Sequence, residues 1–140
     1  MKAEEFVRFV DECLKPAIEP LGFTTETIIS GRLYLAEFAS DTRVVAVSYE
    51  PGDESVTVFF FSVVDGVRSD PDDINATPRL SDLNKIFCKE LAEARIHSKT
   101  HSKESGGAED RLRKAAKELS VVLPLLIARD RGDQRGARSQ

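Results

Sequence analysis

The sequence predicts an α+β domain with an N-terminal helix, a four-stranded antiparallel meander sheet and two C-terminal helices packed on the sheet. Three observations predict this order. Apolar residues recur at helical spacing near both ends of the chain, and β-rich runs lie between these two regions. Short turns rich in Gly, Pro, Ser and Asp separate the runs, and connections this short favour antiparallel neighbours.

The composition is that of one folded domain. The chain has 140 residues, of which 41% are hydrophobic and 31% charged, as in globular domains. No apolar run is long enough to span a membrane, and acids interrupt the N-terminal apolar pattern, unlike in a secretory signal. We therefore expect a cytoplasmic protein in which Cys13 and Cys88 are small buried side chains rather than a disulfide. Residues 1–128 are predicted to form the domain, and 129–140 a disordered basic tail.

The first helix and the strands are read from periodicity and turn residues. A helix is predicted over residues 3–19, with Pro16 expected to kink it or to end it near Lys15. Strands are predicted over 23–30, 32–40, 43–50 and 55–64, and the sequence EPGDE makes the turn before the last strand. Residues 65–78 read as a loop because they are rich in Asp, Pro, Gly and Asn.

Two further helices follow the strands. The first is predicted over residues 78–96, with Thr77 as its N-cap and Pro78 at its first position. The second is predicted over 108–127, and Pro124 should bend it or mark its end. The polar segment between them reads as an exposed linker or a loop with helical ends.

The last predicted strand is apolar on both sides. Alternation places Val58 and Phe60 on one face and Phe59 and Phe61 on the other. Leaving a phenylalanine wet forgoes about 1.5–3 kcal/mol of burial. The simplest interpretation is that one of the C-terminal helices covers Phe59 and Phe61. A dimer or partner interface is the second interpretation, and a small-ligand groove is the third.

Few residues suggest catalysis. His97 and His101 have the spacing of a metal pair on a helix, but no supporting carboxylate or cysteine accompanies them, so a solvated loop is favoured. Nucleophile and phosphate-binding motifs are absent from the sequence. The basic residues of the last third lie mostly opposite the apolar stripe, with no aromatic side chain among them to stack on a base. We predict no catalytic residue, metal, cofactor, nucleic acid or membrane partner.

Charge is distributed unevenly along the chain. Residues 1–96 carry 10 Lys or Arg and 18 Asp or Glu, a net −8, whereas residues 97–140 carry 10 and 6, a net +4. Acids cluster at two places, which are Asp65, Asp70, Asp72 and Asp73 in the loop, and Glu50, Asp53 and Glu54 in the turn. The loop acids have a structural interpretation as an Asx-rich turn. Their functional interpretation is an acidic rim that attracts a basic protein.

Three segments carry a resemblance to a known class of proteins. They are FVRFVDECLKPAIEPLGF (6–23), VAVSYEPGDESVTVFF (45–60) and LSDLNKIF (80–87). Together with the order of elements, they resemble small bacterial immunity-type proteins found beside polymorphic toxins, and related α+β families. The resemblance implies a single-domain, non-enzymatic inhibitor that binds a toxin domain, often a basic nuclease, through an acidic surface. The basic C-terminal tail departs from that pattern.

The leading hypothesis is therefore a non-enzymatic, cytoplasmic protein-binding module of the immunity or adaptor kind. Its candidate partner-binding residues are Asp65, Asp70, Asp72, Asp73, Glu50, Asp53, Glu54, Phe59 and Phe61. The second hypothesis is a structural homodimer joined through the face that carries Phe59 and Phe61. The third is an enzyme or small-ligand domain with a pocket between the sheet and the helix predicted over 78–96, lined by acids such as Glu37 or Asp82.

Overall fold

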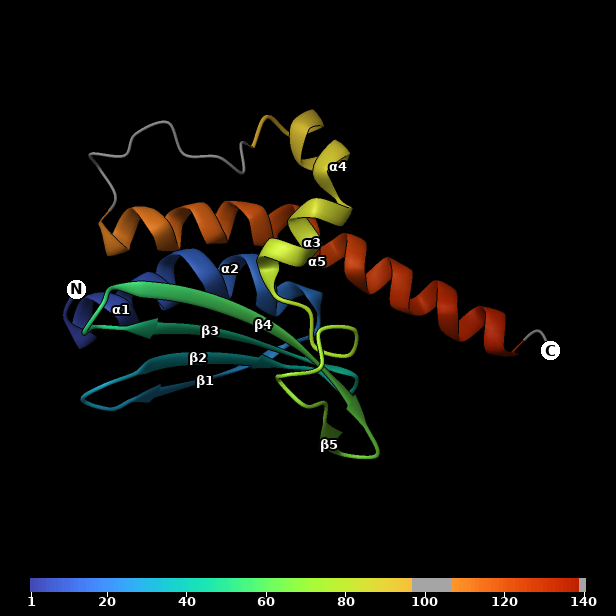
Figure 1. Ribbon diagram of the computed structural model, residues 1–140, viewed down its shortest axis with the longest axis horizontal. Coiled ribbons are helices and arrows are strands. Elements are labelled where there is room, and N and C mark those ends of the chain that lie inside the picture. Colours follow the sequence, from blue (N-terminus) through green and yellow to red (C-terminus); the bar gives the residue numbers. More distant parts are fainter. Residues whose placement is uncertain (97–106, 139–140) are drawn as a thin grey trace.

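The protein is an α+β domain in which helices lie on one side of an antiparallel sheet (Figure 1). The computed structural model describes residues 1–96 and 107–138, with side chains described as far as residue 132. The predicted fold class and the antiparallel meander are confirmed. The histidine pair His97 and His101 lies outside the described residues. Among the described helices, none has the length and apolarity needed to cross a bilayer.

The N-terminal helical segment continues past Pro16. It consists of α1 (Ala3–Phe9), a π-helical turn η1 (Val10–Leu14), α2 (Lys15–Ile18) and a 3-10 turn η2 (Glu19–Leu21). Proline lacks an N–H, and its ring clashes with the carbonyl four residues earlier. The wider turn η1 lies just before Pro16, and Lys15 N–H donates to the carbonyl of Val10, five residues back. A local π turn is a known way for a helix to absorb such a break, so the chain stays helical to Leu21.

The sheet has five strands in sequential order rather than the predicted four. They are β1 (Thr24–Ile29), β2 (Tyr34–Ala39), β3 (Arg43–Glu50), β4 (Ser55–Val64) and β5 (Val67–Arg68). The fifth strand falls inside the predicted loop over 65–78. Asp65 and Gly66 have positive φ values of 53° and 76°, as in the two-residue turns that join hairpins. This turn reverses the chain and pairs Val64 with Val67.

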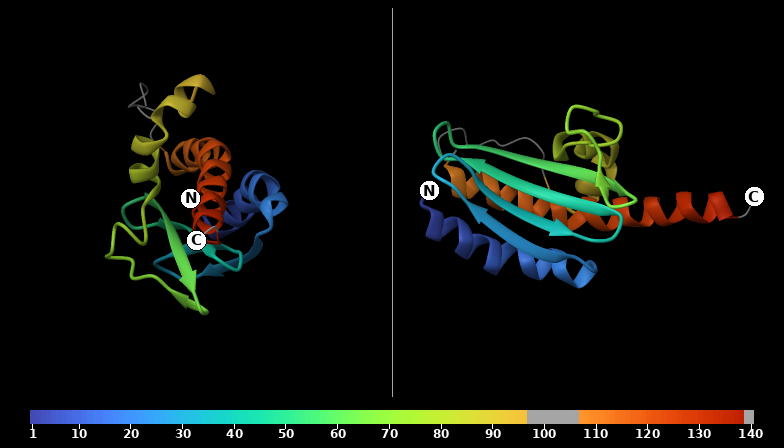
Figure 2. Two further views of the ribbon diagram at one scale, coloured as in Figure 1. Left: turned by 90° about the vertical axis from the view of Figure 1, so that its right-hand side faces the viewer. Right: turned by 90° about the horizontal axis from the view of Figure 1, so that it is seen from below.

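The core lies between the helices and one face of the sheet. Cross-strand register places Phe38, Val45 and Phe60 in one row, and all three are fully buried. Helical residues complete this core, namely Phe6, Val10, Leu14, Ile18, Leu83, Leu112, Leu119 and Leu123. The two views of Figure 2 show the N-terminal helical segment and α5 (Ala108–Arg138) on this same side of the sheet.

The predicted helix over 78–96 is instead two short helices, α3 (Leu80–Ile86) and α4 (Cys88–Glu93). They are separated at Phe87, whose ψ of 26° leaves the helical region. The N-cap is Arg79, whose backbone N–H donates to Asp82 at 3.0 Å. Thr77 is not the cap, because its hydroxyl donates to the carbonyl of Asp70 inside the preceding loop.

The last helix is longer than predicted. Pro124 lies inside α5 without ending it, and in Figure 1 the second half of α5 slopes away from the direction of the first. The helix extends to Arg138, where the sequence predicted a disordered tail. The domain boundary at residue 128 stays a prediction. The expectation that both cysteines are buried is wrong for Cys88, which is exposed, and Cys13 is partly buried; both are free.

Candidate partner-binding surface

The face of the sheet opposite the core carries no helix of the described residues (Figure 2, right). Register places Glu26, Glu37, Ala46 and Phe59 in one row of this outer face, and Thr24, Ala39, Val44 and Phe61 in the next. The interpretation that a C-terminal helix covers Phe59 and Phe61 is therefore wrong. Both rings are partly buried, so something other than a helix shields them.

Two arginines shield the phenylalanines. The rings of Phe59 and Phe61 form a tilted pair with centroids 6.0 Å apart. The guanidinium of Arg79 lies 5.2 Å from the centroid of Phe59, and that of Arg68 lies 5.7 Å from the centroid of Phe61. Such cation–π contacts contribute about 0.5–1 kcal/mol at exposed sites. These four residues, together with Glu37, are referred to below as the aromatic face.

Glu37 fixes the position of Arg68. The two side chains form a bidentate ion pair, with N–O distances of 2.6 and 2.9 Å. This hydrogen bonding is the main reason that the pKa of Arg68 is raised above its ordinary value. The pair joins β2 to β5 across β3 and β4, and beneath it Val44 and Ala46 of β3 are each only 4% exposed. On the outer face, β3 and β4 are thus covered by side chains from neighbouring strands rather than by a helix.

The acidic candidates of the loop divide into two kinds. The carboxylates of Asp70 and Asp73 accept backbone N–H groups of the same loop, at 2.9 Å from Asp72 and 3.1 Å from Asn75. These are Asx turns, so the structural interpretation holds for these two residues. The carboxylates of Asp65 and Asp72 accept no hydrogen bond from a described residue, and both side chains are exposed.

The acidic turn before β4 shows the same division. Asp53 accepts the hydroxyl and N–H of Ser55, at 2.9 and 3.3 Å. The carboxylates of Glu50 and Glu54 are exposed and bond to no described residue. This turn and the acidic loop lie at opposite ends of β4 (Figure 1), and a strand of this length spans about 33 Å. The structure does not bring the two acidic groups together.

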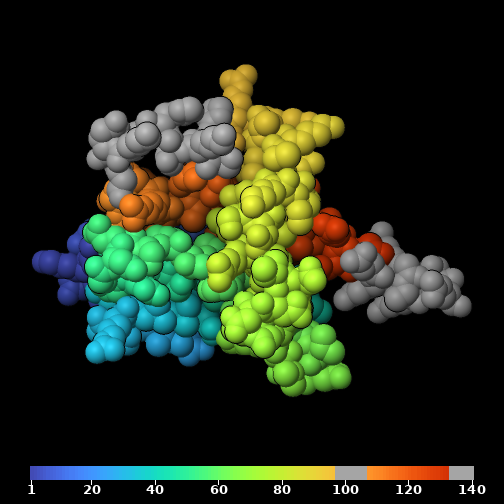
Figure 3. Space-filling model, in the orientation of Figure 1, coloured from blue at the N-terminus to red at the C-terminus, as the bar shows by residue number. Residues whose placement is uncertain are grey.

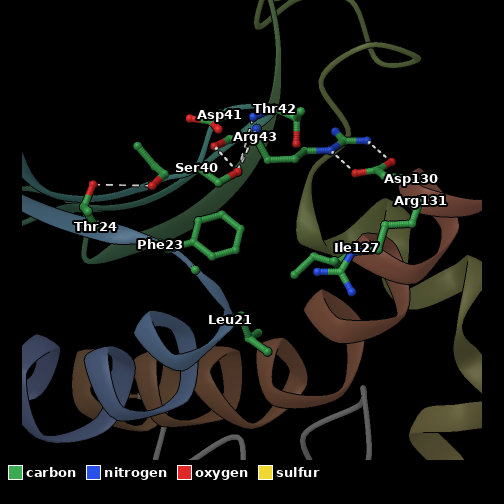
Figure 4. A pocket seen from close by; sticks show the side chains of 12 residues that line it. Leu21, Phe23, Thr24, Ser40, Asp41, Thr42, Arg43, Ile127, Asp130 and Arg131 are labelled. Atoms are coloured by element: carbon green, nitrogen blue, oxygen red, sulfur yellow. Dashed lines mark hydrogen bonds and ion pairs between the residues drawn. The ribbon is translucent and has the colours of Figure 1, made fainter. Parts of the chain in front are cut away.

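A cavity of about 520 Å³ lies between the start of β1, the β2–β3 turn and α5 (Figure 4). Arg43 and Asp130 form a bidentate pair there, with N–O distances of 2.8 and 3.0 Å. The remaining terminal nitrogen of Arg43 donates to the carbonyl of Phe60 at 3.4 Å. Because the guanidinium is fully engaged, this pair serves to attach α5 to the sheet.

The acids proposed for an enzyme pocket have other roles. Glu37 is bonded to Arg68 on the outer face, and it lines neither the cavity beside Arg43 nor the groove between β4 and α3. Asp82 accepts the backbone N–H at the start of α3. In the described part of the chain, no three His, Cys, Asp or Glu side chains gather as metal ligands would.

Arg68 and Arg79 were not among the residues proposed from the sequence. A signal for Arg68 was present, because Asp-Gly at 65–66 is typical of a two-residue hairpin turn. Such a turn pairs Arg68 with Val63, on the same face as Phe61. No local pattern places Arg79 over Phe59, since the contact depends on how the loop over 69–78 returns to the sheet.

Comparison with protein families, with curated proteins and with solved structures found no match to this chain. The aromatic face is therefore interpreted from its own geometry and chemistry.

Proposed function

We propose that the protein is a non-enzymatic protein-binding module and that the aromatic face is its binding surface. The observation that carries this proposal is the pair Phe59 and Phe61 on a sheet face that bears no described helix. Aromatic and arginine side chains are enriched at the centres of protein interfaces, where they dominate the binding energy. Here two phenylalanines and two arginines lie together, and the Glu37–Arg68 pair holds one of the arginines in place before any partner binds.

The specific form that we propose is a cytoplasmic immunity protein that neutralises a toxin domain. The resemblance of the three sequence segments supports this form, as does the net charge of −8 over residues 1–96. An acidic body raises the association rate with a basic partner and slows association with other acidic proteins. Asp65 lies in the turn between β4 and β5, Asp72 lies in the loop after β5, and both side chains are exposed, so a basic partner could meet them.

A binding experiment with two variants tests the surface. The probe is the purified toxin domain encoded by a neighbouring gene, titrated calorimetrically into the protein. The double variant Phe59→Ser/Phe61→Ser should weaken binding by about 30-fold or more, as expected for interface anchors worth about 2 kcal/mol or more. The control is Ile86→Ser on α3, which removes an exposed apolar side chain away from the aromatic face and should leave affinity unchanged.

Two results would count against the proposal. Wild-type affinity in the folded double variant would show that the aromatic face is not the interface. An association rate that does not change with salt would remove the role of the acidic body, because electrostatic steering falls steeply as ionic strength rises.

A homodimer through the same face is the second candidate. Ile28 belongs to the outer face and is 45% exposed, so the apolar surface continues toward the β1 edge. A second copy would bury this side chain together with the phenylalanines. Sedimentation equilibrium separates this candidate from partner binding.

A further inference from the structure

Part of the outer edge of β4 has no neighbouring strand. β3 pairs with β4 from Ser55 to Ser62. On the other side, β5 pairs only with Val63 and Val64, and Phe60 N–H donates to the carbonyl of Pro78 at 2.9 Å. Arg79 continues this contact as a single bridge opposite Phe59. The first four residues of β4 therefore have an open edge among the described residues.

Alternation shows which backbone groups this edge presents. Val63 N–H points to β3, because it donates to the carbonyl of Thr42. The backbone N–H and C=O groups of the even-numbered residues of β4 point away from β3, as shown by the N–H of Phe60, which donates to the carbonyl of Pro78. The N–H and C=O of Val56 and the N–H of Val58 therefore face outward, and no described residue bonds to them. The carbonyl of Glu54 is already taken by Arg111, at 2.6 Å, which marks the end of the open edge.

This open edge forms one wall of a groove whose other walls are α3 and α5. The groove has a volume of about 640 Å³, and Figure 3 shows β4 in green, α3 in yellow and α5 in orange meeting on one face of the molecule. We call it the edge groove. Its volume lies within the range of about 300–1,000 Å³ that is usual for ligand sites.

The lining of the edge groove is basic, although the domain around it is acidic. Its charged residues are four cations, Arg79, Lys85, Arg111 and Lys114, and one acid, Glu118. Glu118 is only 4% exposed. Its carboxylate accepts the side-chain amide of Asn84 at 2.8 Å and faces Lys114 at 4.0 Å. The charge available to a ligand is therefore positive.

We propose that the edge groove binds an extended acidic peptide segment of a protein partner, which adds to β4 as a strand beside Val56 and Val58. Adding a strand to a free sheet edge satisfies outward N–H and C=O groups alternately, which a phosphate backbone cannot do because it lacks donors. The described lining also has no aromatic side chain to stack on a base. The four open residues match a peptide stretch of about 13 Å. This site is separate from the aromatic face except for Arg79, which contacts both.

Three pools of capped hexapeptides test the proposal on the full chain. Each pool varies apolar residues at alternate positions, and the positions between them are all Glu, all Gln or all Lys. Binding is followed by amide NMR shifts. The Glu pool should shift the amides of Val56 and Val58 and bind about tenfold or more tightly than the Gln pool, and the Lys pool should not bind. A Glu pool methylated at the backbone nitrogens should lose most of its affinity, because it cannot pair as a strand.

A charge variant completes the test. Lys85→Glu, in the groove, should weaken the Glu pool by about five- to tenfold. Lys117→Glu, an exposed lysine on α5 outside the groove lining, should change it little. The proposal is overturned if the Glu pool fails to bind at millimolar concentration, if methylation has no effect, or if both variants weaken binding equally. Tighter binding of a short single-stranded oligonucleotide that is lost in Lys85→Glu would also overturn it. Phe61 lies outside the groove, so Phe61→Ser should leave peptide binding unchanged. This variant therefore separates the test of the edge groove from the test of the aromatic face.

Discussion

Phe60 and Phe61 show that two adjacent phenylalanines can have different roles within one strand. Phe60 is fully buried against the helices, whereas Phe61 is partly buried on the outer face under Arg68. The alternation of the strand places these side chains on opposite faces, because successive residues point to opposite sides of the sheet. Their contributions to stability should therefore differ.

Alanine substitution measures that difference. Phe60→Ala should lower the free energy of unfolding by about 3–5 kcal/mol, the usual loss for a core phenylalanine. Phe61→Ala should lower it by about 1–2 kcal/mol, because only part of the ring is buried and one cation–π contact is lost. Urea unfolding followed by circular dichroism gives both values. Equal losses would show that the outer face is as well packed as the core.

Glu118 is the residue whose charge state should control stability most clearly. Burial raises its pKa above the ordinary 4.5, while Lys114 and the amide of Asn84 act in the opposite direction. The folded protein therefore holds this proton more tightly than the unfolded chain does. Its effect on stability is favourable in acid and is lost as pH rises through the folded pKa.

The variant Glu118→Gln should remove this pH dependence. Glutamine does not titrate, and its amide can also donate to the buried Oδ1 of Asn84, which has no partner among the described residues. Relative to the wild type, the variant should gain stability as pH rises above the ordinary carboxyl pKa, with little difference at the acid end. Urea unfolding at several pH values measures it, with the exposed Glu12→Gln as control. If the variant instead becomes less stable than the wild type as pH rises, the buried Glu118 carboxylate does not destabilise the fold.

At the scale of elements, α5 is held to the sheet by more than apolar packing. The ion pair between Arg43 on β3 and Asp130 on α5 lies beyond Pro124, where the helix has already changed direction (Figures 1 and 4). Its side chains are 14% and 25% exposed. This pair is the reason to expect that the region around Asp130 belongs to the folded domain.

Removing one charge of the pair tests that expectation. Asp130→Asn should lower the free energy of unfolding by about 1–2 kcal/mol, a value between those of surface and buried ion pairs. The matched control is Glu109→Gln, which breaks an exposed pair with Arg113 on the same helix and should cause no resolvable change. If Asp130→Asn is equally silent, the second half of α5 does not contribute to the fold.

At the scale of the whole molecule, the two proposed surfaces differ in chemistry and in place. The aromatic face presents two phenylalanine rings on the outer side of the sheet. The edge groove has a basic lining and lies between the sheet edge and the C-terminal helices. Acidic residues flank β4 at both ends, with Asp53 and Glu54 before it and Asp65 after it. Variants in one surface should therefore weaken only the partner that binds that surface.

Sedimentation equilibrium decides between partner binding and a homodimer. Under the proposed function, we expect a monomer at low micromolar concentration, and Phe61→Glu should stay folded because a partly exposed position tolerates a charge better than the core does. A dimer that Phe61→Glu dissociates would favour the second candidate. A monomeric wild type removes it.

Much of the fold could be predicted from local patterns. The limits of β3 and β4 agree with the prediction at both ends, because period-two alternation and the turn over 50–54 are signals carried by neighbouring residues. The hairpin at Asp65 and Gly66 was missed, although its turn signal was present. The division at Phe87 was missed because the apolar spacing continues through it.

The candidate surface could be predicted only in part. Phe59 and Phe61 were identified from alternation alone. Arg68, Arg79 and the partner of Glu37 were not, since each contact joins residues far apart in the sequence. A pocket between the sheet and the helix over 78–96 was among the hypotheses, but the acids expected in it, Glu37 and Asp82, do not line the edge groove. Its basic lining was not predicted, because its walls come from three separate elements.

The sequence by itself determines the order of helices and strands and the two apolar faces of β4, because periodicity and turn chemistry are local properties of the chain. Only the tertiary structure decides what covers the second face. There, two arginines and Glu37 shield the phenylalanines in place of a helix. The physical reason is that burial depends on which distant side chains the folded sheet brings together.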